Sequence, residues 1–537
     1  MSTPSSEYVY DVVGLGFGPA NIAVAGAIIE KWGQSEVAGS RNDIKKVLFI
    51  EKSDRFRWHP GMLLPDARMQ ISFLKDLATL RSPQSPITFL AYLSSQNRLL
   101  PFINRGSTIP TRKEFADYLS WAAAYVQEKG VGVKYGHQVV GLDDRLDGTV
   151  AVRMKKVGAD EETIVIARNI VISPGGAPRI PEVITAILPH TSIIHSSSYA
   201  TSIRWILSKM ASRPLAIAVV GSGQSAAEVT MDVRGRLSAI GVGDSPQVHE
   251  VDMIIRRGSL KPSDDSPFAN EIFDPSATDA WFSLPADHMR ADRHAEYKST
   301  NYGVVNPRTL EQLYEIVYDQ RLEDNIANRT RCAGTQKPRI SIQPYSSILS
   351  AESTEGLDAS KVRLLIQNSI TRTVAEKRYD VVICATGYER SSWKSLITNS
   401  NVAKWFGLGN SGRAIHLAPE TTRPLTQVAD HLHMHARLVE QSRHEPASPG
   451  SDSSCSTPPT SPLPSTPPSE ENHGTSNTLY VSRHYRLIPL PSHDESEGPK
   501  ARIYVQGVEE ASHGLSDTLL SVLGVRAGEV VADMYKE

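Results

Sequence analysis

Cysteine is scarce in this chain, and no charge of one sign predominates. The three cysteines, Cys332, Cys384 and Cys455, are far apart and have no CxxC or histidine spacing, so the sequence indicates neither a disulfide framework nor a metal site. The 57 basic and 59 acidic residues give a net charge of −2, without the basic excess that is usual in proteins that bind nucleic acids or anionic membranes. We therefore expect no nucleic-acid partner and no metal.

Long apolar runs are also missing. The longest have the length of a β-strand, as in LAIAVV at 215–220, and the first residues, MSTPSSEYVYD, contain no apolar signal region. We therefore expect no membrane span, no export and a cytoplasmic location. With 537 residues, of which 40% are hydrophobic and 22% charged, the chain is long enough for two or three globular domains.

A glycine-rich loop lies near the beginning of the chain. YVYDVVGLGFGPANIAVAGAII, residues 8–29, has the pattern of a strand, a glycine loop and a helix. Gly14, Gly16 and Gly18 allow a tight turn and a close approach of the backbone to a pyrophosphate, whose charge the helix N-terminus favours. The next apolar run, KKVLFIE, ends at Glu51, whose carboxylate can accept hydrogen bonds from a ribose. This pattern predicts a dinucleotide-binding unit.

The same pattern recurs in LAIAVVGSGQSAAEV at 215–229, with Gly221 and Gly223 after an apolar strand. The strand expected to reach the ribose of this second nucleotide, EVDMIIRRGS, ends in Arg256 and Arg257 instead of an acid. Guanidinium groups suit a 2′-phosphate, so the second cofactor is predicted to be NADPH. The alternative for two arginines at a strand end is a solvated edge.

Two such loops in one chain are typical of a flavin nucleotide on the first and a pyridine nucleotide on the second. The apolar strands at 167–181 and 378–390 both end in glycine turns, which suggests that the chain crosses between domains there. Between them, Leu310, Leu313, Ile316 and Val317 have helical spacing. A redox sensor that binds both nucleotides without catalysis remains an alternative.

We predict an α/β protein with two Rossmann-like dinucleotide-binding domains, for FAD and NADPH, the second inserted in the first, and a small helical substrate subdomain. The segment 445–475, rich in Ser and Pro, cannot bury a core and is predicted to be disordered. The predicted boundaries are 1–200 and 389–537 for the FAD-binding domain, 201–272 and 335–388 for the NADPH-binding domain, and 273–334 for the helical subdomain.

A lysine occupies an apolar neighbourhood in MQISFLKDLATL, residues 69–80. Lys75 is surrounded in sequence by Ile71, Phe73 and Leu77, and burial of its ammonium is costly unless an anion meets it. On this stretch alone, the simpler interpretation is a lysine that reaches water along a helix face or pairs with Asp76.

Six stretches occur in this order: RFRWHPGMLLPDARMQISFLKDLATLRSP, VVGSGQSAAE, LKPSDDSPFANEIFDP, TNYGVV, DVVICATGY and HGLSDTLLSVL. With them the chain resembles the L-ornithine N5-monooxygenases of siderophore biosynthesis, particularly the fungal ones, over nearly everything from Val9 onward. The resemblance implies N5-hydroxylation of L-ornithine by O2, with FAD and NADPH, through a C4a-hydroperoxyflavin. It implies no metal, no protein nucleophile and a homotetramer. The Ser/Pro segment and the stretch 235–250 depart from the family pattern.

The resemblance also implies site residues. FAD contacts are expected at the glycines of the first loop and at Glu51, Lys52, Trp58, His59, Gln70, Val139 (through the backbone), His513, Gly514 and Leu515. NADPH contacts are expected at Gly221, Ser222, Gly223, Gln224, Ser225, Arg256, Asn301, Tyr302 and Gly303. Ornithine contacts are expected at Lys75, Asn270, Glu271, Ile272, Phe273, Asn301 and Ser516.

Each of these positions has a structural alternative. Asn270 and Asn301 suit turns or caps, Ser516 suits a helix cap before Asp517, and Trp58 suits a core. The nearest enzymatic alternative is an L-lysine N6-hydroxylase, whose substrate is longer by one methylene, a difference worth about 1–3 kcal/mol in a pocket. The sequence leaves the choice between these substrates open.

Overall fold

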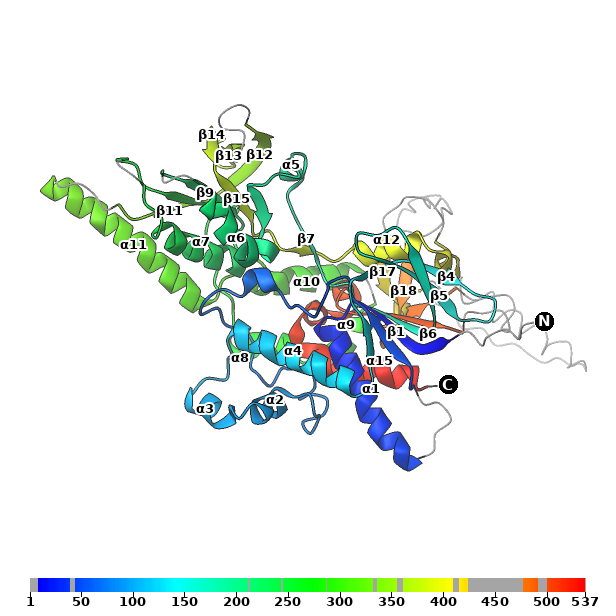
Figure 1. The fold of residues 1–537 in the computed structure, drawn as a ribbon. Helices are drawn as coiled ribbons and strands as arrows, with labels where there is room; N and C mark the ends of the chain where they lie inside the picture. Colours follow the sequence, from blue (N-terminus) through cyan, green and yellow to red (C-terminus); the bar gives the residue numbers. More distant parts are fainter. Residues whose placement is uncertain are drawn as a thin grey trace, which may run out of the picture.

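The computed structural model describes residues 8–38, 44–210, 213–242, 245–285, 287–331, 336–354, 361–408, 415–423, 477–490 and 500–536. The chain forms two sheet-based units with a group of helices between them (Figure 1). Cys332, Cys455 and the predicted disordered segment at 445–475 lie outside the described residues. Within the described ranges, no helix has both the length and the apolar character needed to cross a membrane.

The first unit is built on a seven-stranded sheet in the order β3-β2-β1-β6-β5-β4, with β20 also paired to β6. The long strand β6 pairs with antiparallel β5 through its first half and with parallel β20 through its second half. The strands are β1 (Val9–Leu15), β2 (Val47–Ile50), β3 (Gly132–Lys134), β4 (His137–Asp144), β5 (Val150–Lys156), β6 (Glu162–Ile172) and β20 (Arg502–Val505).

Side chains of β1 alternate between two cores, as the two-residue period of a strand requires. Val12 packs in a core with the helices α1 (Pro19–Ala38), α4 (Arg112–Glu128) and α15 (Leu523–Met534) on one face. Val13 packs on the other face with α12 (Ser392–Thr398), η5 (Asn401–Phe406), β17 (His416–Pro419), β18 (Thr478–Val481) and β19 (Leu487–Ile488). The far C-terminal part of the chain therefore completes the first unit.

The second unit has a parallel sheet in the order β11-β10-β9-β15-β8. Its strands are β8 (Ile193–His195), β9 (Ala216–Val220), β10 (Glu250–Ile254), β11 (Arg339–Gln343) and β15 (Val381–Cys384). One face is covered by α6 (Tyr199–Ser208), α7 (Gln224–Leu237) and α11 (Pro307–Thr330). The other is covered by α5 (Glu182–Thr185) and the sheet of β12 (Ser346–Ser353), β13 (Val362–Asn368) and β14 (Val374–Tyr379).

Strand β8 corrects one predicted boundary. Residues up to 200 were assigned to the first unit, but β8 pairs in parallel with β15 of the second sheet. The strand is only three residues long and no glycine loop follows it, so the sequence contains no signal for its sheet. Two short strands, β7 (Ala177–Pro178) and β16 (Tyr388–Glu389), pair where the chain passes between the units.

Short helices lie between the two units and near the first sheet (Figure 1). Those between the units are α8 (Pro267–Asn270), η3 (Glu271–Phe273), α9 (Ala277–Phe282) and α10 (Asp287–Asn301), which pack near α14 (Glu510–His513) and η7 (Leu515–Thr518). The remaining described helices are η1 (Pro60–Met62), α2 (Phe89–Ser95), α3 (Leu99–Asn104), η2 (Ser196–Ser198), η6 (Glu420–Thr422) and η8 (Leu520–Val522).

Candidate functional site

The first glycine loop has the geometry of a nucleotide cradle. Gly16 has φ +86°, and a Cβ there would lie 2.6 Å from the carbonyl oxygen of Ser173, whereas a Cβ on Gly18 would meet nothing within 4 Å. Glu51 accepts hydrogen bonds from the backbone N–H of Phe17 (2.9 Å) and of Ser53 (2.8 Å). The carboxylate therefore joins the loop to the end of β2 and keeps further lone pairs for ribose hydroxyls.

The segment after β2 runs beside this cradle. Lys52 is exposed, and His59 has a left-handed backbone (φ 42°) with its ring 5.8 Å from that of Tyr388. Val139 lies at a register shift in β4, two residues after His137, whose N–H donates to the Glu51 carbonyl (3.0 Å). This hydrogen bond places the start of β4, which contains Val139, beside Glu51 at the end of β2.

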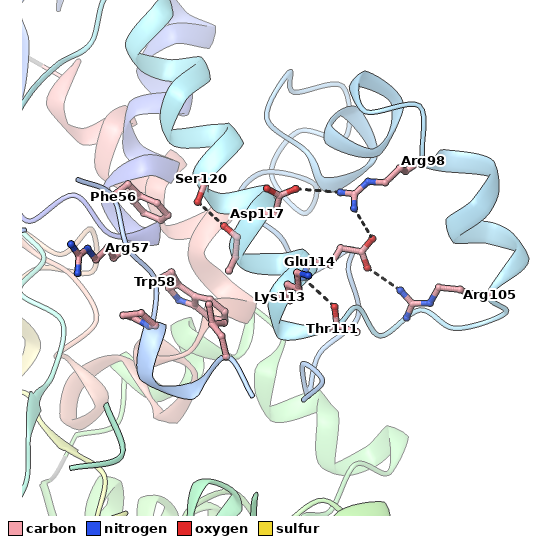
Figure 2. A pocket seen from close by; sticks show the side chains of 13 residues that line it. Phe56, Arg57, Trp58, Arg98, Arg105, Thr111, Lys113, Glu114, Asp117 and Ser120 are labelled. Atoms are coloured by element: carbon pink, nitrogen blue, oxygen red, sulfur yellow. Dashed lines mark hydrogen bonds and ion pairs between the residues drawn. The ribbon is translucent and has the colours of Figure 1, made fainter. Parts of the chain in front are cut away.

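Trp58 is half-buried, so part of it belongs to the core, as the structural alternative requires. Its ring lies 5.7 Å from that of Phe115, and it lines a cavity of about 750 Å³ (Figure 2). Figure 2 shows Glu114 in that cavity between Arg98 and Arg105. Glu114 pairs with Arg105 (2.9 Å). Because these charges are paired with one another, we do not assign this cavity to the substrate.

The turn that follows α14 is buried, and its histidine side chain is engaged by protein groups. The His513 ring is buried, stacks on Tyr485 with 4.2 Å between centroids, and its Nδ1 lies 2.9 Å from the Ser512 hydroxyl. Burial lowers the pKa of His513 to about 4. The imidazole is therefore neutral and enclosed by protein, which leaves the backbone of His513, Gly514 and Leu515 as the part that can contact FAD.

The second glycine loop is equally constrained. Gly221 has φ +141°, and a Cβ there would lie 2.3 Å from the Ala385 carbonyl oxygen. Ser222 and Ser225 are half-buried beside it. The Gln224 side chain donates to Glu228 (2.7 Å) and accepts from the backbone N–H of Asn306 (2.7 Å). Since that amide is already engaged, Gln224 can offer a nucleotide chiefly its backbone.

The two arginines after β10 have different surroundings. Arg257 donates to the carbonyl oxygens of Gly303 (3.2 Å) and Tyr302 (3.3 Å). Arg256 is exposed, and no group in the described part of the chain forms a hydrogen bond or ion pair with it. Of the two guanidinium groups, that of Arg256 is therefore the one left available to a ligand or to water.

A cavity of about 940 Å³ lies where the two units and the helices meet. It is lined by Gln70, Lys75, Gln224 and Asn270, residues expected from the sequence to serve FAD, ornithine and NADPH. Arg308 also lines this cavity. One cavity thus collects side chains from three parts of the chain.

Lys75 differs from both simpler interpretations. Residues 69–80 form turns and no helix, and Asp76 is buried, accepting from the backbone N–H of Ala78 (2.9 Å), Thr79 (2.6 Å) and Phe89 (2.6 Å). The two simpler interpretations, a lysine along a helix face and an ion pair with Asp76, are therefore both wrong. The Lys75 ammonium lies 5.6 Å from the centre of the Phe273 ring. Burial lowers its pKa, and the nearby Asp274 acts in the opposite direction.

The two asparagines expected at the substrate lie at the C-terminal ends of helices, and their amide nitrogens donate to nearby backbone carbonyls. The Asn270 amide donates to the carbonyls of Asp265 (3.0 Å) and Ser266 (3.1 Å). The Asn301 amide donates to the Tyr297 carbonyl (2.9 Å). No donor in the described part of the chain reaches either Oδ1. These oxygens can accept from a substrate amine.

The other expected ornithine residues are close to one another. Glu271, Ile272 and Phe273 form η3, which packs against η7, the helix that contains buried Ser516. The N-cap of η7 is Gly514, so Ser516 does not cap that helix. Of the expected ornithine residues, Lys75 and Asn270 line the 940 Å³ cavity, whereas Glu271, Ile272, Phe273, Asn301 and Ser516 do not.

Sequence reasoning missed Glu510. Its carboxylate accepts from His294 (3.0 Å), Arg390 (3.2 Å) and the hydroxyls of Tyr302 and Thr518. These donors come from α10, the turn after it, the second crossing segment and η7. No local pattern marks a residue whose partners lie up to 216 positions away, so no sequence signal could have found it.

An ion pair between the units was also missed. Arg112 of α4 donates to both carboxylate oxygens of Glu228 in α7 (2.7 and 3.0 Å). It joins the first unit to the second beside the Lys75 cavity, which Glu228 lines. This ion pair therefore holds the two units together at the wall of the 940 Å³ cavity.

Comparison with known proteins identifies close relatives. The family model described as L-lysine 6-monooxygenase/L-ornithine 5-monooxygenase matches residues 8–390. The L-ornithine N(5)-monooxygenase of Coprinopsis cinerea is 51% identical over 552 residues, which cover 99% of this chain and 98% of that protein. The enzyme of the same name from Ceriporiopsis subvermispora is 49% identical, with 99% of each chain covered.

Two solved structures agree with these relatives. Ornithine hydroxylase (PvdA) of Pseudomonas aeruginosa has a TM-score of 0.71 and 32% identity, with 98% of this chain and 99% of that chain covered. The ornithine N-hydroxylase KtzI of Kutzneria sp. 744, solved with reduced FAD, NADP⁺ and L-ornithine, has a TM-score of 0.70 and 28% identity over the same shares. The α/β fold with two dinucleotide-binding units is confirmed.

Proposed function

The chain belongs to the L-lysine 6-monooxygenase/L-ornithine 5-monooxygenase family, and from this we propose that it is an L-ornithine N5-monooxygenase. It converts L-ornithine, O2, NADPH and a proton to N5-hydroxy-L-ornithine, water and NADP⁺, with FAD, for hydroxamate siderophore biosynthesis. The observation that supports this most is the cavity of about 940 Å³, in which Lys75, Gln70, Asn270 and Gln224 meet. A protein that only bound two nucleotides would not need these groups around one space.

Bound FAD supplies the oxygen chemistry and NADPH supplies the electrons. The residues fit the first cofactor, because the positive φ of Gly16 and the open space at Gly18 leave room for a pyrophosphate, and Glu51 faces the ribose position. They fit the second because Gly221 makes the equivalent turn and Arg256 offers an exposed guanidinium. His513, Gly514 and Leu515 contribute backbone to the flavin side.

The substrate is held at its two ends. We assign the α-carboxylate of ornithine to the Lys75 ammonium, whose neighbours leave it facing the cavity. The Oδ1 atoms of Asn270 and Asn301 accept from the side-chain amine. A free alkylamine with pKa near 10.4 is only about 0.1% neutral at pH 7.4. Uncharged amide acceptors in a desolvated pocket favour the neutral amine, the form that has a lone pair to be oxidised.

The measurement that tests this function compares three substrates. NADPH oxidation and hydroxylamine formation are followed side by side with L-ornithine, with L-lysine and without an amine. We expect hydroxylamine to form with ornithine only. Lysine should at most accelerate NADPH oxidation, without being hydroxylated. Peroxide as the sole product with ornithine would refute the function in favour of an oxidase or redox sensor, and equal hydroxylation of lysine would indicate the N6-hydroxylase.

We propose the predicted division into domains with two changes: β8 and α11, which both pack with the second sheet, are assigned to the NADPH-binding domain. We also propose a cytoplasmic location, which the free buried thiol of Cys384 suits.

The assembly is proposed to be a homo-oligomer, a homotetramer by family resemblance. Along α11, Tyr314, Tyr318, Leu322 and Ile326 are exposed at intervals of four residues. Figure 1 shows this helix running beyond the second sheet. Such a row is one of the ridges by which helices pack against each other. Leu322→Glu should therefore lower the mass found by light scattering, and an unchanged mass would exclude this face as an interface.

A further inference from the structure

The turn Asn301–Tyr302–Gly303 connects three parts of the structure. On one side, Gly303 lies on the second glycine loop: a Cβ on Gly223 would be 3.3 Å from the Gly303 Cα. On the other side, the Tyr302 hydroxyl joins Glu510 and lies 3.2 Å from the Thr518 hydroxyl of η7. The turn therefore touches the NADPH loop and the flavin-side turn at once.

Arg257 holds this turn by its backbone. Its guanidinium donates to both carbonyl oxygens of Tyr302 and Gly303, at 3.3 and 3.2 Å. Gly303 has φ +65°, and a Cβ there would lie 3.6 Å from the guanidinium carbon of Arg257. A planar fork of donors can bind two neighbouring carbonyls together, which the single ammonium of a lysine does less well.

The neighbouring residue connects Arg257 to the cofactor. Arg256 is adjacent in sequence, exposed, and assigned above to the 2′-phosphate. Both arginines follow β10 after a single residue, Ile255, so a nucleotide that fixes Arg256 also restrains the backbone of Arg257. The turn at 301–303 also contains Asn301, which is assigned above to the substrate amine.

We propose that Arg257 is a positioning residue that couples occupation of the NADP site to the affinity for ornithine. NADP⁺ bound at Arg256 and the second glycine loop restrains the strand end, which stabilises the existing hydrogen bonds of Arg257 to the turn, and Asn301 presents its Oδ1 to the amine. This inference rests on the proposed function for the identity of the ligands. Its physical content is a coupling free energy between two sites, which must be the same in both directions.

The test measures that coupling without turnover. Oxidised, FAD-loaded protein is titrated with L-ornithine in the absence and presence of saturating NADP⁺, and with NADP⁺ in the absence and presence of ornithine, by calorimetry. For the wild type we expect each ligand to tighten the other by about five-fold or more, by equal factors in the two directions. In Arg257→Met the factor should fall to near one. A wild-type factor near one, or a full factor in Arg257→Met, would overturn the proposal.

Arg256→Met is the matched control, since it removes the adjacent guanidinium. It should weaken NADP⁺ itself about ten-fold or more, yet at saturating NADP⁺ it should keep the coupling that Arg257→Met loses. If both variants lose the coupling equally, the effect belongs to the strand end as a whole and Arg257 has no role of its own.

Arg257→Lys and hydrogen exchange of the turn guard against a folding defect. If Arg257→Met is poorly folded, Arg257→Lys, which retains a donor, should show a coupling factor between one and the wild-type value. A coupling factor equal to that of the wild type would contradict the role assigned to the two-pronged guanidinium. Amide exchange at 301–304 should rise in Arg257→Met while α7 stays protected. Absence of hydroxylated product from the wild type would refute the proposed function, whereas an active wild type with unchanged coupling in Arg257→Met would refute only this inference.

Discussion

Replacement of Lys75 tests the substrate model most directly. The ammonium is half-buried, lies 5.6 Å from the Phe273 ring centre and forms no ion pair among the described residues. A hydrogen bond to a charged group contributes about 1.5–3 kcal/mol. Because Lys75 remains partly in contact with water, which screens the charge, we take the lower part of this range. Lys75→Met should then raise the KM for ornithine about 10- to 30-fold.

The assay is steady-state hydroxylamine formation with ornithine and with putrescine, which lacks the carboxylate. A contact far from the reacting nitrogen acts about equally on ground state and transition state, so kcat should change less than KM. The rate of flavin reduction by NADPH should change little. Putrescine should be nearly insensitive to the substitution. If the substitution raises KM equally for ornithine and for putrescine, Lys75 does not bind the carboxylate.

Arg308 provides the matched control, because it lines the same cavity. Arg308→Met should leave the KM for ornithine within about two-fold of the wild type, since changes away from specific contacts cost within about 0.5 kcal/mol. A larger effect there than in Lys75→Met would transfer the carboxylate to Arg308. Burial also lowers the pKa of Lys75, so the KM of the wild type should begin to rise at a lower alkaline pH than a free lysine would predict. Lys75→Arg should delay that rise.

Three further predictions concern cofactors and stability. Arg256→Ala should weaken NADPH by about 1.5–3 kcal/mol and NADH far less, and equal losses in binding assays would show that the residue only supports the fold. Gly16→Ala should abolish FAD retention, because a Cβ would lie 2.6 Å from the Ser173 carbonyl at φ +86°, whereas Gly33→Ala in α1, where a Cβ meets nothing within 4 Å, should leave the flavin absorbance unchanged. His513, whose folded pKa of about 4 lies below its unfolded value, stabilises the fold above the unfolded pKa and loses that contribution as pH falls toward 4. Denaturation of His513→Gln should therefore show a smaller loss of stability between pH 7 and 5 than the wild type, and parallel curves would contradict it.

The nucleotide units could be predicted from the sequence because their signals are local. A strand, a glycine loop and a helix lie within about 22 residues at 8–29 and again at 215–229, and the backbone angles that require Gly16 and Gly221 arise inside those segments. Lys75 could be recognised as costly to bury from its neighbours alone. Its partner could not, since Asp76 turned out to hold the backbone of Ala78, Thr79 and Phe89 instead.

Tertiary structure alone decided the remaining assignments. Arg256 and Arg257 are identical and adjacent in the sequence, yet only Arg257 is directed to the carbonyls of Tyr302 and Gly303. β8 joined the second sheet because its backbone pairs with β15, in which the partner of Ile193 is Val382, 189 residues later. Glu510 became a junction because donors from three distant segments, together with Thr518 eight residues away, converge on it. Side-chain direction and long-range convergence depend on packing across the whole chain, which a local pattern of residue types does not contain.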